Sequence, residues 1–171
     1  MDEQVTEVAG IVIPSASPVF LSIVALHVAV ALVAVLTGIV AMLSPKAVGR
    51  HPRYGRLYFW SLFGVFVSAS ALSFMRWAEN YLLFIIGASA FALALIARTA
   101  VRARWPAWPR IHLIGMGSSY TLLLIAFYLD NGKNLPLWRD LPAASYWAIP
   151  AAIGIPFILW TLLRHPLTRP R

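Results

Sequence analysis

Four histidines and a set of small polar residues are the main candidates for a chemical role in this sequence. His27 lies about halfway along a long apolar segment, where an ionisable side chain is costly and usually faces a partner inside a helix bundle. A rise of about 1.5 Å per helical residue places polar or small residues of other apolar segments at a similar depth. These residues are Ser68, Ser70, Ser89, Ser118, Ser119, Tyr120 and Gly154. We therefore expect a polar layer at mid-depth, in which His27 is a ligand, a proton carrier or a cofactor anchor.

The same residues have a second interpretation, which is helix packing. Small side chains let membrane helices approach each other closely, and Ser, Gly and Ala are common at such contacts. Gly64 and Ser68 stand four residues apart, as do Gly115 and Ser119, so each pair would share one helix face. A neutral histidine that donates one hydrogen bond to a neighbouring helix also needs no further role. Both interpretations stay open for His27, whereas packing is the simpler one for the serines.

A second group combines histidine with arginine beside the apolar segments. The loop 49–58 reads GRHPRYGRLY, and its pattern His-x-x-x-Gly-x-x-Tyr is more regular than a loop requires. Together with the start of a later segment it supplies a candidate contact for a phosphate, a carboxylate or an anionic lipid. The candidate residues are His51, Arg53, Gly55, Tyr58, Arg110 and His112. Elsewhere, Arg76 is followed one helical turn later by Glu79, and we expect an interfacial ion pair between them.

Metal and haem chemistry find little support in the sequence. The chain has no cysteine, and its apolar segments hold no carboxylate, so a zinc site lacks ligands. A bis-histidine haem needs two histidines that face each other at one depth, but only His27 lies deep in a segment, while His112 lies near the end of one. We therefore predict no cofactor and no metal, and keep haem as an alternative.

The composition points to a lipid environment for these residues. Hydrophobic residues make up 60% of the 171 and charged residues 12%, against about 25% charged in soluble domains. About 20 apolar residues cross the hydrocarbon core, and five segments meet that length. They cover residues 19–43, 57–77, 81–100, 111–129 and 145–163, and the last is interrupted by Pro150 and Pro156. The predicted fold is an all-α integral membrane protein, a bundle of five transmembrane helices.

The charges predict the orientation of this bundle. Eleven of the fourteen basic residues fall on one side of the predicted membrane and all six acidic residues on the other, so the basic side should be cytoplasmic. An odd number of spans then places the N-terminus outside and the C-terminus in the cytoplasm. We expect an extracytoplasmic tail at 1–16, a single transmembrane domain at 17–164 and a basic cytoplasmic tail at 165–171. The net charge of +8 is thereby explained by topology and anionic lipid, without a nucleic-acid partner.

Several of these residues resemble the pattern of a known family. The pattern comprises Leu26-His27 with Gly38, then His51-Pro-Arg-Tyr-Gly55-Arg-Leu-Tyr58, Arg110-Ile-His112, Ser118-Ser119-Tyr120, Phe127-Tyr128 and Asn134-Leu135-Pro136. Across about residues 27–166 the chain resembles a family of predicted bacterial multi-pass membrane proteins of unknown function. The resemblance implies a bacterial cytoplasmic membrane and importance for His27, His51, Gly55, Tyr58 and His112. It implies no activity.

Three functions follow as hypotheses from these observations. The first is the binding or transport of a small or lipophilic molecule within the bundle near His27. The second is a structural or assembly subunit that packs its small residues, Gly64, Gly87, Ala88, Gly115 and Ser119, against another membrane subunit or a second copy. The third is a redox protein that uses haem or quinone. The sequence leaves open whether the protein is an enzyme.

Overall fold

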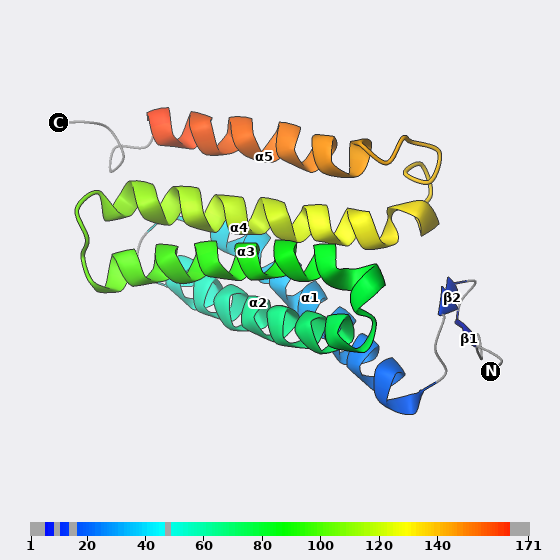
Figure 1. The fold of residues 1–171 in the computed structure, drawn as a ribbon. Coiled ribbons are helices and arrows are strands. Elements are labelled where there is room, and N and C mark those ends of the chain that lie inside the picture. The colour runs from blue at the N-terminus through cyan, green and yellow to red at the C-terminus, as the bar shows by residue number, and fades with distance from the viewer. Residues whose placement is uncertain (1–5, 9–10, 14–16, 47–48, 165–171) are drawn as a thin grey trace. The chain divides into compact units, whose positions relative to one another are not determined.

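The computed structural model describes residues 6–8, 11–13, 17–46 and 49–164. Two short strands, β1 (Thr6–Val8) and β2 (Ile11–Ile13), form an antiparallel pair before the first of five long helices (Figure 1). The helices are α1 (Pro18–Leu43), α2 (Arg50–Met75), α3 (Trp77–Arg102), α4 (Trp108–Asn131) and α5 (Ser145–Arg164), with a 3₁₀ turn, η1 (Gly132–Asn134), after α4. The chain divides into two compact units, and the boundary between Phe84 and Ile85 falls within α3.

All five helices are long and apolar enough to cross a membrane, which indicates a multi-pass membrane protein. The prediction of five helices of spanning length and composition is therefore confirmed for the described residues. The pair β1–β2 lies in the predicted tail 1–16 and was not anticipated. The predicted basic tail 165–171, which includes His165, lies outside the described residues.

The second helix begins earlier than the sequence analysis predicted. α2 starts at Arg50, whereas hydropathy placed the start of this span at Leu57, and the predicted loop conformation of His51–Tyr58 was wrong. Residues 50–56 are too polar for hydrocarbon but compatible with a helix. Pro52 stands in the first turn, where its missing N–H has no intrahelical partner to lose. Hydropathy thus marked the apolar part of the helix and not its full length.

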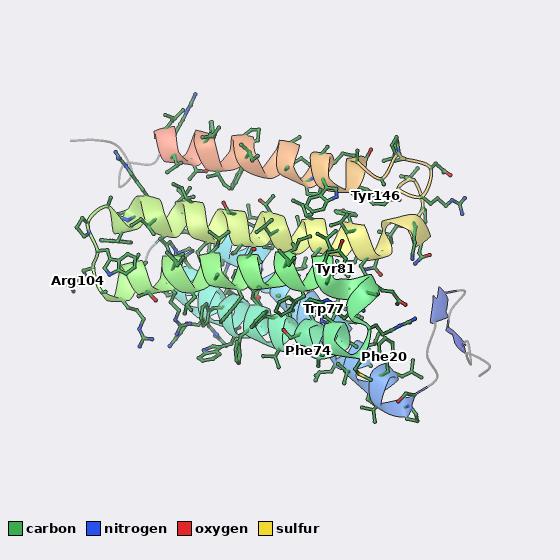
Figure 2. All side chains as sticks on the ribbon, in the orientation of Figure 1. Phe20, Phe74, Trp77, Tyr81, Arg104 and Tyr146 are labelled. Carbon is green, nitrogen blue, oxygen red and sulfur yellow. The ribbon has the colours of Figure 1, made fainter. Side chains whose placement is uncertain are left out.

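The junction between α2 and α3 is a break at a single residue, Arg76, with φ −142° and ψ 64°. Residues 78–80, which the sequence prediction leaves as a short turn between two spans, belong instead to the first turn of α3. Glu79 is favourably placed there, at the positive end of the helix dipole. The expected ion pair is confirmed, with Nε of Arg76 lying 2.9 Å from Oε2 of Glu79. Phe74 and Trp77 stack beside it with ring centroids 6.3 Å apart (Figure 2).

In the first unit, α1 and α2 pack against each other over a seam of small residues (Figure 1). The positions of α1 that are buried in its C-terminal half are Ala34, Thr37, Gly38 and Ala41, which recur every three or four residues. On α2, a Cβ added to Gly64 would lie 3.7 Å from the side chain of Val30, an ordinary van der Waals distance. Small residues at these positions let the two backbones approach closely.

In the second unit, a row of alanines forms the buried face of α3. These residues are Ala90, Ala94, Ala97 and Ala100, each at most 1% exposed. Gly115 of α4 lies against this row, and a Cβ built on it would stand 2.7 Å from Cβ of Ala97 and 2.8 Å from the carbonyl oxygen of Leu93. Here, too, side-chain size sets the distance between the helices.

The connection from α4 to α5 is ordered by aromatic rings. Tyr128 and Trp138 stack with centroids 3.7 Å apart, and Tyr146 lies 6.2 Å beyond Trp138. The ring of Tyr146, labelled in Figure 2, covers Gly132 so closely that a Cβ there would come within 2.7 Å of it. This cluster fixes the start of α5 beside the end of α4.

Candidate functional site

His27 is held by a hydrogen bond between two membrane-spanning helices. Its Nδ1 atom on α1 lies 2.9 Å from Oγ of Ser68 on α2. Oγ of Ser68 also lies 2.7 Å from the carbonyl oxygen of Gly64 and 3.1 Å from that of Val65, one turn earlier in α2. The imidazole is half-buried, so the protein encloses only part of its surface.

The other predicted site residue of the first unit, Ser70, does not join this pair. Its hydroxyl donates to the carbonyl oxygen of Phe66 at 2.7 Å, four residues earlier in the same helix. Two residues along a helix correspond to a rotation of roughly 200°, so Ser68 and Ser70 point to different faces of α2. Equal depth therefore did not bring the two serines to one site.

The predicted site residues of the second unit point in several directions. Ser89 is exposed on α3, and Ser118 is half-buried on α4. Ser119 is fully buried and donates to the carbonyl oxygen of Met116 at 2.8 Å, and Tyr120 is 9% exposed. Three consecutive helical residues are each about 100° apart, so they cannot line one wall together. Burial of Ser119 on the same face as Gly115 agrees with a packing role.

His51 links the start of α2 to the end of α1. Its Nδ1 atom lies 2.8 Å from the carbonyl oxygen of Ala41, one of the α1 carbonyls with no partner inside the helix. The ammonium group of Lys46 donates to the same oxygen at 3.2 Å and to that of Met42 at 2.5 Å. The partial burial that accompanies these contacts lowers the pKa of Lys46 below its usual value of 10.5. The histidine and the lysine together satisfy the C-terminal end of α1.

Since α2 starts at Arg50, the pattern His51-x-x-x-Gly55-x-x-Tyr58 is helical and its three residues share one face. Tyr58 is 3% exposed on this face. A Cβ added to Gly55 would meet nothing within 4 Å, so close packing does not explain this glycine. Arg53 points away from the shared face and is exposed. The four members of the predicted anion-contact set that lie on α2 therefore divide between a buried face and an outer face of this helix.

Arg110 and His112 lie in the first two turns of α4, in the second unit. Both are half-buried, and the Nδ1 atom of His112 is enclosed by protein atoms. Among the residues that the structure describes, no group of three His, Asp or Glu side chains lies close enough to hold a metal ion.

Two features of these sites were not predicted from the sequence. Lys46 was counted only as a positive charge that orients the helices, but it follows the end of an apolar span by three residues, where a lysine can reach the last carbonyls. The stacking of Tyr128 and Trp138 has no signal in the spacing alone, because the two rings meet only through the conformation of the connection.

The chain was compared with protein families, curated proteins and solved structures. No family model matches the chain, and neither the curated proteins nor the solved structures give a match. The resemblance to bacterial multi-pass membrane proteins of unknown function thus stays a prediction.

Proposed function

We propose that this chain is a multi-pass protein of a bacterial cytoplasmic membrane that binds a small or lipophilic molecule beside His27. The observation that carries the proposal is the 2.9 Å hydrogen bond between His27 and Ser68, which joins α1 to α2 within their apolar segments. An imidazole oriented at that depth is costly unless it has a partner, and such residues commonly mark a binding or transfer pathway.

The charge distribution supports an orientation with the N-terminus outside and the C-terminus in the cytoplasm. Lys46 and the arginines at the start of α2 lie at the α1–α2 connection, and Arg102, Arg104 and Arg110 lie at the α3–α4 connection. Basic residues are retained in short cytoplasmic connections, so both connections would be cytoplasmic. Attachment of a cysteine-reactive probe to single cysteines at 103 and 144, in intact cells, tests the assignment, since the natural chain has no cysteine.

The chemistry of the site favours a ligand with a polar group on an apolar body. A neutral imidazole has one N–H donor and one lone pair, so it can exchange hydrogen bonds with a hydroxyl or phenol as well as with Ser68. Leu26 and Val28, which flank His27, are 59% and 51% exposed and offer apolar contact to either side. A hydroxylated lipophilic molecule, such as a quinol or a sterol-like compound, fits this combination.

The test uses variants whose effects differ only if the imidazole binds a ligand. Wild type, His27→Leu, Ser68→Ala and Ser70→Ala are purified in mild detergent, extracted with organic solvent and compared by mass spectrometry. We expect one extracted compound to be depleted in the first two variants and retained in Ser70→Ala, the matched control that loses a hydroxyl without touching His27. The proposal would be refuted if all four proteins gave the same extracted compounds, the His27→Leu protein were more stable than wild type, and cells carrying it kept the wild-type phenotype.

A spectrum of the purified protein before and after dithionite tests the haem form of the redox alternative. A Soret band that shifts on reduction would establish haem and replace the proposed ligand. A featureless spectrum directs the search to the extracted compounds.

An assembly role is favoured by one observation in the second unit. A Cβ built on Gly87 of α3 would meet nothing within 4 Å, so this glycine leaves room for a neighbouring helix. Gly64 and Gly115, by contrast, already contact Val30 and Ala97 of the same chain. Purification of the protein as a lone monomer in mild detergent would argue against this second function.

A further inference from the structure

α2 has an outer face, defined here by six exposed residues that recur every three, four or seven positions. They are Arg53, Arg56, Trp60, Phe63, Val67 and Phe74. On the opposite side of the helix, Tyr58, Leu62 and Val65 are buried. The outer face therefore follows one line along the helix, with both arginines at one end and apolar side chains along the rest.

The length of α2 places the arginines of the outer face in the headgroup region. The helix has 26 residues and is about 39 Å long, whereas the hydrocarbon core is about 30 Å thick. The apolar part begins only at Leu57, so Arg53 and Arg56 extend beyond the hydrocarbon. Trp60 lies one turn further in, at the depth where indole rings gather in membrane proteins.

The charges at the N-terminal end of α2 favour the binding of an anion. The N-terminus of a helix carries a partial positive charge and is stabilised by acidic side chains, yet the first turn of α2 has none and its N-cap is Gly49, without a side-chain acceptor. Residues 50–75 contain no Asp or Glu at all. Arg50, Arg53 and Arg56 add three positive charges to the same end, which is unfavourable unless a negative group offsets them.

We propose that the outer face of α2 binds one anionic phospholipid. Arg53 and Arg56 hydrogen-bond its phosphate group, and Phe63 and Val67 contact its acyl chain. The ring of Trp60 stands between them, oriented by edge contacts to Phe59 at 5.5 Å and to Phe63 at 6.0 Å. A choline or ethanolamine headgroup would bring its own positive charge toward the arginines, so the site selects a headgroup with net negative charge.

The expected selectivity follows from two arginines. Each basic residue close to an anionic membrane surface contributes about a fivefold increase in affinity, so removal of both should lower the preference for an anionic lipid roughly 25-fold. This site is separate from His27, and its test does not depend on the ligand proposed there.

The experiment is a titration of the full chain, in mild detergent, with phosphatidylglycerol or phosphatidylcholine, followed by native mass spectrometry. We expect wild type to bind phosphatidylglycerol more tightly and Arg53→Gln/Arg56→Gln to lose the preference. Arg102→Gln/Arg104→Gln is the matched control, because it removes the same charge from two other exposed arginines. An absent preference in wild type, or an equal loss in both double variants, would overturn the proposal.

A third variant keeps the charge and removes the indole. Trp60→Leu should weaken the binding of both lipids and preserve the preference for the anionic one. Unchanged binding of both lipids in this variant would overturn the placement of the lipid along the outer face.

Discussion

Replacement of Gly115 by alanine measures how closely α3 and α4 pack in the second unit. The added Cβ would lie 2.7 Å from Cβ of Ala97 and 2.8 Å from the carbonyl oxygen of Leu93. Carbon atoms pack best at about 3.5–4.0 Å, so the helices must separate by about 0.8 Å or more at this point. Neither partner can rotate away, because one is a Cβ and the other is a backbone atom.

The size of the effect follows from two opposing contributions. Overpacking of a tight site typically costs about 1–3 kcal/mol. Alanine is favoured over glycine within a helix by about 1 kcal/mol, which partly offsets that cost. Gly87→Ala has the same propensity gain but meets nothing within 4 Å, so it isolates the second contribution. The difference in unfolding free energy between the two variants should therefore be about 1–3 kcal/mol, with Gly115→Ala the less stable.

Both variants are unfolded by adding a denaturing detergent to the protein in mild detergent. The loss of the helical circular dichroism signal then gives this difference in unfolding free energy directly. Gly117→Ala completes the series, since its Cβ would approach Ile158, whose side chain can partly move aside. We expect it to fall between the other two. If Gly115→Ala and Gly87→Ala change stability equally, the α3–α4 contact does not have the described spacing and the reasoning fails.

Three further predictions concern the helix ends. His51→Ala should cost about 1 kcal/mol of unfolding free energy, because the carbonyl of Ala41 loses a hydrogen bond, whereas Arg50→Ala, a neighbouring control, should cost less. The pKa of Lys46 is lowered in the folded chain, so the unfolded chain binds the proton of this ammonium group more readily. The free energy of unfolding should therefore rise with pH in the interval just below 10.5. Lys46→Met should abolish this rise when unfolding is measured as a function of pH. Tyr146→Ala should lower the free energy of unfolding by about 3 kcal/mol, because the ring above Gly132 is lost. Tyr146→Phe keeps the ring and should change this free energy by under about 1 kcal/mol in thermal unfolding.

Hydropathy predicted the number of membrane-spanning helices because the hydrocarbon core imposes a minimum apolar length. It located the two ends of α1 and α5 within one residue, since both helices are bounded by short polar or proline-containing segments. It missed the first seven residues of α2, because a helix that extends into the headgroup region needs no apolar side chains there. Helix ends beyond the membrane are decided by backbone hydrogen bonds, and hydropathy does not report on those.

The depth of a residue was easier to predict than its direction. His27 and Ser68 were expected at a common depth, and the structure joins them. Ser70 was expected at the same depth but lies on another face of α2, and Ser89, also expected there, is exposed on α3. An apolar helix in lipid has no polar side from which its inner face could be deduced, so rotation about the helix axis depends on which small residues pack.

The polar groups within the spans differ in what they require from the rest of the structure. A hydroxyl can donate to the carbonyl four residues earlier, as Ser68, Ser70 and Thr121 do, and so needs no second helix. The imidazole of His27, by contrast, makes a hydrogen bond to Ser68 across to α2. A serine can therefore occur in a span without a tertiary partner, whereas His27 links its helix to a neighbouring one. For this reason His27, and not the more numerous serines, is the residue through which a function of this bundle should first be tested.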